Sequence, residues 1–261
     1  MMRIGCNARR LNITGESRIM LVVMVLLTWM PLTGQIVKSA PFPILSQHAD
    51  YTEQLLKDLS WSQGDTYVQA MATKIDNLDD YVFDSSLTAL KEGEESQDLG
   101  RMYYKKNNLV RLEAKSGKIN KGSTVVRRKD GKIRAAGGGV LKFVKMTLDE
   151  DSRLLQLPNG YNAIKSDLSS LLTPLCQQLA KHSIVSRVSS GTVSGQKWST
   201  SVKIVELKDS FTGERLHLIF VDPQTEIPLE WDVYRGGKLI SITTFDNFRA
   251  NQGLEERLFD I

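Results

Sequence analysis

The residues of this sequence that could do chemistry are few and stand far apart. The histidines are His48, His182 and His217, and none lies in an HExxH pattern or beside a cysteine at a spacing typical of metal ligands. Ser194 and Lys197 spell the SxxK motif of some serine hydrolases, but they lie in a polar turn and no partner motif follows. The sequence therefore predicts neither a catalytic site nor a metal site, and no cofactor.

Other residues that resemble functional motifs also favour structural interpretations. The glycines 137–139 lack the Lys-Ser/Thr that follows a phosphate-binding loop, and they are typical of a bulge or strand crossing. Paired carboxylates such as Asp79–Asp80 and Glu94–Glu95 fall in predicted turns, where a solvated surface is expected. We therefore expect a protein that is not an enzyme. An unrecognised hydrolase is the alternative that a buried charged cluster would favour.

The first forty residues differ from the rest in composition. Arginines precede an apolar run at residues 19–32, and small and polar residues follow at 33–40. This order is typical of a secretory signal. The run is short for a permanent anchor, because a spanning helix needs about 20 apolar residues. We expect residues 1–39 to be a signal cleaved near Gly34 or Ser39, and an uncleaved N-terminal anchor in the inner membrane is the alternative.

The formal charge of +4 belongs to this N-terminal segment, because residues 40–261 carry equal numbers of acidic and basic side chains. Binding to a phosphate backbone needs a net basic face. The sequence therefore predicts no nucleic-acid partner. Once the signal is removed, Cys176 is the only thiol, which excludes an intramolecular disulfide.

The remaining chain alternates between two periodicities. Residues 50–76 and 166–182 carry apolar side chains at helical spacing, although Pro174 predicts a kink or a later start in the second segment. Residues 81–146 and 198–245 instead alternate with period two and contain tight turns. Helices are too few and too clustered for repeated βαβ units.

These patterns predict an α+β fold. We expect a strongly curved antiparallel sheet, an incomplete β-barrel, wrapped around one or two helices. No internal repeat and no long linker is visible, so residues 46–261 are expected to form a single domain. Residues 168–179 should be helical and lie against the sheet.

A curved sheet that does not close must fill its concave side with side chains, its own helix or an apolar ligand. From the alternation, the expected apolar lining comprises Tyr104, Val110, Leu112, Phe143, Leu218, Phe220 and Trp231. An error of one residue in register would move a strand's side chains to the other face. Leu171, Leu172 and Leu175 are expected to form part of a lid over this face. A solid core is the alternative.

Several short motifs resemble those of a known group. Residues 100–113, GRMYYKKNNLVRLE, combine a glycine and an aromatic strand, a polar turn, and an arginine between apolar residues. An Asp-Gly turn follows at residues 130–131, and residues 222–228 spell DPxTxxP before the late hairpin. Over about residues 65–250 the chain resembles the LolA/LolB/RseB superfamily of lipoprotein- or lipid-binding half-barrels, nearer its uncharacterised members than the true carriers.

The resemblance implies a LolA-like half-barrel in the periplasm or another extracytoplasmic space. It implies non-catalytic binding of an acyl chain, a lipid or a lipidated protein, as in lipoprotein transport, with membrane contact. It also implies that Arg111 helps to hold a closed lid. Pairing of Arg111 with Glu113 on one strand face is the alternative. An envelope sensor or interaction protein in the manner of RseB, with a filled concave face and an envelope protein partner, is the alternative function.

Overall fold

The computed structural model describes residues 44–261, apart from residues 92, 118–120 and 196. The predicted secretory signal, residues 1–39, lies outside the described residues. Within the described part of the chain, no helix is long and apolar enough to cross a membrane. The helical elements are α2 (Ile44–Leu56), α3 (Asp65–Asp76) and α4 (Leu168–Ala180), and the 3₁₀ turns η1 (Gly139–Leu141), η2 (Arg153–Leu155), η3 (Ala163–Lys165) and η4 (Glu256–Phe259).

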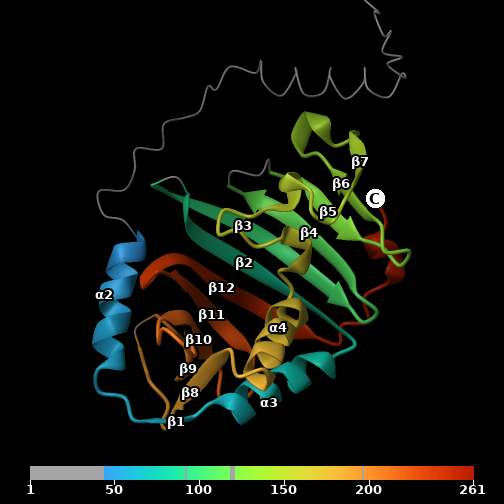
Figure 1. Ribbon diagram of the computed structural model, residues 1–261. Helices are drawn as coiled ribbons and strands as arrows, with labels where there is room; N and C mark the ends of the chain where they lie inside the picture. The colour runs from blue at the N-terminus through green and yellow to red at the C-terminus, as the bar shows by residue number, and fades with distance from the viewer. Residues whose placement is uncertain (1–43, 92, 118–120, 196) are drawn as a thin grey trace, which may run out of the picture. The chain divides into compact units, whose positions relative to one another are not determined.

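The strands form one sheet, which Figure 1 shows as a curved, open surface. They are β1 (Trp61–Gln63), β2 (Asp80–Lys91), β3 (Glu94–Lys105), β4 (Leu109–Ser116), β5 (Thr124–Arg127), β6 (Ile133–Ala136), β7 (Lys145–Leu148), β8 (Ile184–Ser189), β9 (Lys203–Asp209), β10 (Arg215–Val221), β11 (Pro228–Arg235) and β12 (Lys238–Ala250). Their order is β1-β8-β9-β10-β11-β12-β2-β3-β4-β5-β6-β7, and the neighbours pair antiparallel. The predicted fold class is therefore confirmed.

The pairing register divides the side chains between two faces of the sheet. Phe83 and Trp231 mark the inner face, where they join one buried cluster with apolar residues of α3 and α4. Figure 1 shows α3 and α4 side by side against the sheet. Leu218 and Phe220 mark the outer face, where they join a second cluster with residues of α2. The sheet is thus covered on both faces over β9 to β12, and the two covers have different chemistry.

Helix α4 is fixed to the inner face by its leucine stripe and by its N-terminus. Leu168, Leu172, Leu175 and Leu179 are buried at helical spacing. The N-cap residue Asp167 accepts a hydrogen bond from the backbone N–H of Ser170 at 3.0 Å, which satisfies a free amide of the first turn. Tyr81 of β2 donates its hydroxyl to the same carboxylate oxygen at 3.2 Å. The start of α4 is therefore tied directly to the sheet.

Some element boundaries differ from the sequence prediction. The predicted helix 50–76 is two helices, α2 and α3, because β1 intervenes and pairs with β8. Residues 140–144, which belong to the segment 81–146 predicted to alternate as strands, do not form a strand. A 3₁₀ turn begins there at Gly139, whose φ of 57° suits glycine, and β7 starts only at Lys145. Strand β8 was missed because its sequence is short and carries polar residues on both sides of the alternation.

Candidate functional site

An apolar groove lies between the inner face and the chain that covers it. We call it the inner groove. Its floor comes from β2, β3, β4, β11 and β12, and its wall comes from residues 157–171. The residues that line it are Phe83, Ser85, Leu87, Asp98, Leu99, Gly100, Met102, Leu112, Ala114, Ser116, Leu157, Asn159, Tyr161, Ser166, Leu171, Trp231, Val233, Thr243 and Phe245.

The inner groove is small, with a cavity volume of about 70 Å³. Binding sites for small molecules commonly have volumes of about 300–1,000 Å³. Entry of a ligand therefore requires the wall to move.

The wall is held by turns and side chains rather than by strand pairing. Leu155 and Ile164 are fully buried and anchor the segment to the inner core. Asn162 accepts a hydrogen bond from the N–H of Ile164 at 2.9 Å and donates to the carbonyl oxygen of Glu150 at 2.6 Å. Only an isolated bridge between Gln156 and Asn162 adds backbone pairing. Displacing this segment would therefore leave the ladder of the sheet intact.

Two polar groups beside the groove, His217 and Tyr161, are neutral at pH 7. Trp231, which lines the groove, donates its indole N–H to His217 Nδ1 at 3.2 Å. Burial lowers the pKa of His217 to about 4, so its ring is uncharged. Burial also raises the pKa of the groove residue Tyr161 to about 12, so the phenol keeps its proton. These groups orient the lining without adding charge to it.

The predicted site residues on the inner face do not all reach the groove. Leu112 and Trp231 line it from the floor, and Leu171 lines it from α4. Tyr104 and Val110 belong to the inner core beyond the groove, where Tyr104 stacks on Tyr81 with ring centroids 4.7 Å apart. The other two predicted lid residues, Leu172 and Leu175, are buried between α4 and the sheet.

Leu218 and Phe220 were assigned to the wrong face. Phe220 pairs in register with Glu230 and Leu218 with Asp232, whereas the groove residue Trp231 pairs with Ile219. Phe220 stacks on Trp198 at 4.7 Å on the outer face. Residues 218–221 are all buried, so this part of β10 has no polar alternation from which a face could be read.

Phe143 and Arg111 are also placed away from the groove. Phe143 is 81% exposed in the turn between η1 and β7, so it does not line the concave face. Arg111 lies on the outer face, since its neighbours Val110 and Leu112 point inward. It donates to Glu113 at 2.9 Å and to the carbonyl oxygen of Leu258 at 2.8 Å. Its role is therefore the predicted alternative, pairing with Glu113, and it does not touch the lid.

A second constellation lies on the outer face, and the sequence analysis missed it. We call His48, Lys197, Glu230 and Asp232 the outer cluster. His48 belongs to α2, and Glu230 and Asp232 belong to β11. The Nε2 atom of His48 lies 2.7 Å from Asp232 Oδ2 and 3.4 Å from Glu230 Oε1. The Lys197 ammonium forms an ion pair with Glu230 and lies 3.2 Å from His48 Nδ1. The available signal was Glu230 and Asp232 themselves, two acids that fall on one face of a segment predicted to alternate as a strand.

Both carboxylates of the outer cluster are fully buried, and their ionised forms are disfavoured. Burial and the neighbouring Asp232 raise the pKa of Glu230 to about 7, against the pull of Lys197 and His48. Burial likewise raises the pKa of Asp232, although the hydrogen bond with His48 opposes this. A buried acid pair with an imidazole is the arrangement that the sequence analysis associated with catalysis.

The geometry does not support nucleophilic catalysis in the outer cluster. The nearest hydroxyl, Thr52 Oγ1, lies 3.3 Å from His48 Nε2, the same nitrogen that meets Asp232. A relay of the serine-hydrolase type needs the acid and the nucleophile on opposite ring nitrogens. Here the opposite nitrogen faces the ammonium of Lys197. The arrangement is better suited to holding a cation.

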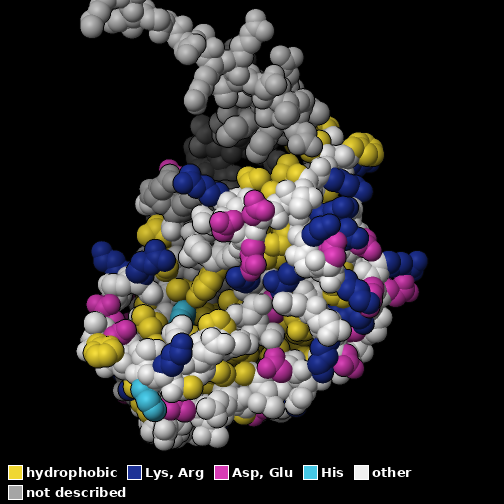
Figure 2. Space-filling model, turned by 45° about the vertical axis from the view of Figure 1, so that its right-hand side comes forward, with side chains coloured by type: hydrophobic (Ala, Val, Ile, Leu, Met, Phe, Trp, Pro, Cys, Tyr) yellow, Lys and Arg dark blue, Asp and Glu magenta, His cyan; other side chains and the backbone are white. Residues whose placement is uncertain are grey.

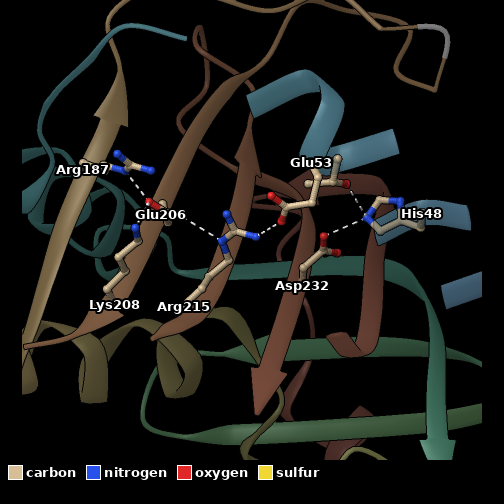
Figure 3. A network of polar contacts seen from close by, with 8 residues as sticks. His48, Glu53, Arg187, Glu206, Lys208, Arg215 and Asp232 are labelled. Carbon is tan, nitrogen blue, oxygen red and sulfur yellow. Dashed lines mark hydrogen bonds and ion pairs between the residues drawn. The ribbon is translucent and has the colours of Figure 1, made fainter. Parts of the chain in front are cut away.

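A neighbouring network on the outer face contains another buried acid, Glu206, whose carboxylate is fully paired with basic side chains. Figure 3 shows Glu206 between Arg187, Lys208 and Arg215, with Arg215 reaching on to Glu53. Glu206 is fully buried, and Arg215 Nε donates to it at 2.8 Å. Burial opposes its ionisation, but the hydrogen bonds from Arg215 and Arg187 hold its pKa below the ordinary value. Glu206 is thus a structural ion-pair centre.

The surface shows no single sign of charge on the side seen in Figure 2. Lys and Arg side chains are interspersed with Asp and Glu, and hydrophobic side chains appear between them. The ion pairs Lys129–Glu256 and Arg128–Asp260 join the basic hairpin tip to the C-terminal tail. This face lacks the continuous basic field that a phosphate backbone requires.

Comparison with known proteins finds similarity in solved structures only. No family model matches the chain, and no curated protein matches it. An uncharacterised conserved protein from Thermus thermophilus is 11% identical, with 76% of this chain and 94% of that chain covered, at a TM-score of 0.45. MucB, also found in a complex with MucA from Pseudomonas aeruginosa, is 14% identical over 76% of this chain and 62% of that chain, at a TM-score of 0.45.

A LolA superfamily protein from Nitrosomonas europaea is 11% identical, with 74% of this chain and 97% of that chain covered, at a TM-score of 0.34.

Proposed function

We propose that this protein is an exported, non-catalytic binding protein that holds an acyl chain, a lipid or a lipidated partner in the inner groove. Under this proposal residues 1–39 direct export, and the domain that follows acts in the periplasm or another extracytoplasmic space. The observation that carries the proposal is the groove itself, which is mostly apolar, opens to solvent and lies beside the neutral groups His217 and Tyr161. Such a lining suits an uncharged hydrocarbon better than a polar substrate.

The energetics of the proposal are favourable. Each buried methylene contributes about 0.8 kcal/mol, so about eight methylenes contribute roughly 6 kcal/mol. The loss of translational freedom and the displacement of the wall oppose this gain. Because the wall is not part of the strand ladder, its movement costs side-chain contacts but no sheet pairing. Since a dissociation constant of 1 μM requires about 8.2 kcal/mol, eight methylenes are expected to bind more weakly than this, and longer chains more tightly.

Adjacent serines on β2 provide a matched pair of variants. Ser85 lines the groove, and its hydroxyl oxygen would lie 3.4 Å from a Cβ placed on Gly100 across the groove floor. Ser86 points to the opposite face, where it accepts a hydrogen bond from Gln97 at 3.0 Å. Replacing Ser85 with Phe should fill the groove, whereas the same replacement at Ser86 should leave it open.

The test is a titration with a fluorescent fatty-acid probe. Wild type and Ser86→Phe should bind it saturably with similar affinity, and Ser85→Phe should weaken binding at least about tenfold, or 1.4 kcal/mol. Leu171→Glu should weaken it as well, because it places a charge in the wall. No saturable binding by wild type, or equal binding by both serine variants, contradicts the proposal.

An envelope sensor or interaction protein is the second candidate. It is favoured by the small space inside the groove and by the close burial of Leu172 and Leu175, which fill much of the inner side. In this case the inner face is a solid core and its edges recognise a protein partner. A negative probe titration with a folded protein would favour this candidate.

A further inference from the structure

The outer cluster contains buried carboxylate oxygens that the protein does not satisfy. Among the described residues, no hydrogen-bond donor serves Asp232 Oδ1, and Glu230 is met only through ion pairs with Lys197 and His48. Both side chains are fully buried. Burying a carboxylate without full pairing is costly. Glu206, on the same face, shows that this fold can satisfy a buried acid with arginines, and it does not do so here.

The donor atoms of three of these residues converge on one point. One ligand atom each from His48, Glu230 and Asp232 lie within 4.8 Å of one another. Zinc binds imidazole nitrogen and carboxylate oxygen at about 2.0–2.2 Å, so the ligand atoms of a tetrahedral site stand about 3.4 Å apart. Side-chain shifts of about one ångström would close the site. One imidazole and two carboxylates would leave a fourth position for water, as in open zinc sites.

The cluster also has a route to solvent. A cleft lined by Ile44, Gln47, His48, Tyr51, Lys197 and Ile242 reaches it from the surface. Lys197 is part of this cleft and is about one-third exposed. It belongs to the connection between β8 and β9, outside the sheet. An entering ion would therefore meet the ammonium first, and the ammonium could move out toward water.

We infer that His48, Glu230 and Asp232 form a binding site for a divalent transition-metal ion of the zinc type, with Lys197 as an internal cation that competes for it. The site joins α2 to β11 on the face opposite the inner groove. A bound ion replaces one positive charge with two and provides a partner for Asp232 Oδ1. Because the site exists only in the folded chain, the ion also raises the stability of the protein.

The test titrates chelator-treated protein with zinc chloride by calorimetry and by competition with a fluorescent zinc indicator. Wild type should bind one ion. Lys197→Gln should raise zinc affinity about tenfold or more, since it removes the competitor. His48→Gln should lower affinity by at least a similar factor. Glu206→Gln, which alters a buried acid outside the site, should leave affinity unchanged, and circular dichroism should establish that each variant is folded.

The Lys197 variant separates this site from a purely structural ion cluster. In a structural cluster its removal only takes one of two ion pairs from Glu230 and lowers stability without metal uptake. A folded Lys197→Gln protein that binds zinc no more tightly than wild type overturns the inference. So does a folded His48→Gln protein that binds zinc as tightly as wild type.

Discussion

The inner and outer faces of this sheet are both buried, but by different means. The inner face packs aromatic and aliphatic residues against α3 and α4, and its buried His217 and Tyr161 are neutral. The outer face packs apolar residues against α2 and also places Glu206, Glu230 and Asp232 in its interior. The inner face thus carries a mostly apolar groove, whereas the outer face carries buried ion pairs.

The difference shows that the face of a strand cannot be judged from burial alone. Adjacent residues of β11, Glu230, Trp231 and Asp232, are all nearly inaccessible, yet they alternate between the outer cluster and the inner groove. The effect of a hydrophobic substitution therefore depends on whether the side chain packs against α3 and α4 on the inner face or against α2 and the buried acids on the outer face. The two faces should respond separately to mutation.

The largest effect is expected for Phe220→Ala on the outer face. Phe220 is fully buried against Trp198 and the residues of α2, so its truncation should cost about 3–5 kcal/mol of unfolding free energy. Because Phe220 lies across the sheet from the groove, the fatty-acid probe should bind the folded variant as it binds wild type. Urea unfolding and the probe titration measure the two properties. Loss of probe binding in a protein that is still folded would show that the faces are not independent.

The second effect concerns pH and the inner face. The pKa of His217 is about 4 in the folded protein against an ordinary value of 6.5. Between these two pH values the imidazole is therefore protonated in the unfolded chain and neutral in the folded chain. Stability from this residue is present above pH 6.5 and is lost as the pH falls from 6.5 toward 4. His217→Gln, which can still accept the Trp231 hydrogen bond, should flatten that part of the curve. Urea midpoints between pH 4 and 7.5 measure it, and an unchanged slope in the variant would exclude His217 as the cause.

The sequence predicted the fold where one side of a strand is polar. In β2, Tyr81, Phe83, Ser85 and Leu87 alternate with more polar residues, which predicted a strand, and these side chains lie on the face toward α3 and α4. In β10, both faces are buried and the alternation disappears, so Leu218 and Phe220 were placed on the wrong side. Periodicity carries information only when the two faces meet different surroundings.

The inner groove and the outer cluster also differ in how far the sequence could predict them. Leu112, Leu171 and Trp231 could be proposed for the groove because each lies on an apolar face of its own element, and their part in binding stays a prediction. The outer cluster could not be predicted from spacing, since His48 and Asp232 are 184 residues apart. Their contact depends on how α2 packs across the sheet, and no local pattern encodes that.

The smallest effect is expected at the start of α4. Asp167 caps the helix and accepts the Tyr81 hydroxyl, so Asp167→Ala should cost about 1–2 kcal/mol of unfolding free energy. Tyr81→Phe removes only one hydrogen bond and should cost about 0.5–1.5 kcal/mol. Ser152 caps the short turn η2 at a long 3.4 Å in an exposed position, so Ser152→Ala is the matched control and should be nearly neutral.

The comparison of Asp167→Ala with Ser152→Ala tests whether the start of α4 anchors the wall of the inner groove. Because Asp167 lies within the wall, loosening the start of α4 should make the wall easier to displace. Asp167→Ala should therefore lower stability while the fatty-acid probe binds at least as tightly and enters faster, as stopped-flow fluorescence would record. Slower or weaker binding in the folded variant would mean that the capped helix forms part of the binding surface, and that the wall does not open from this end.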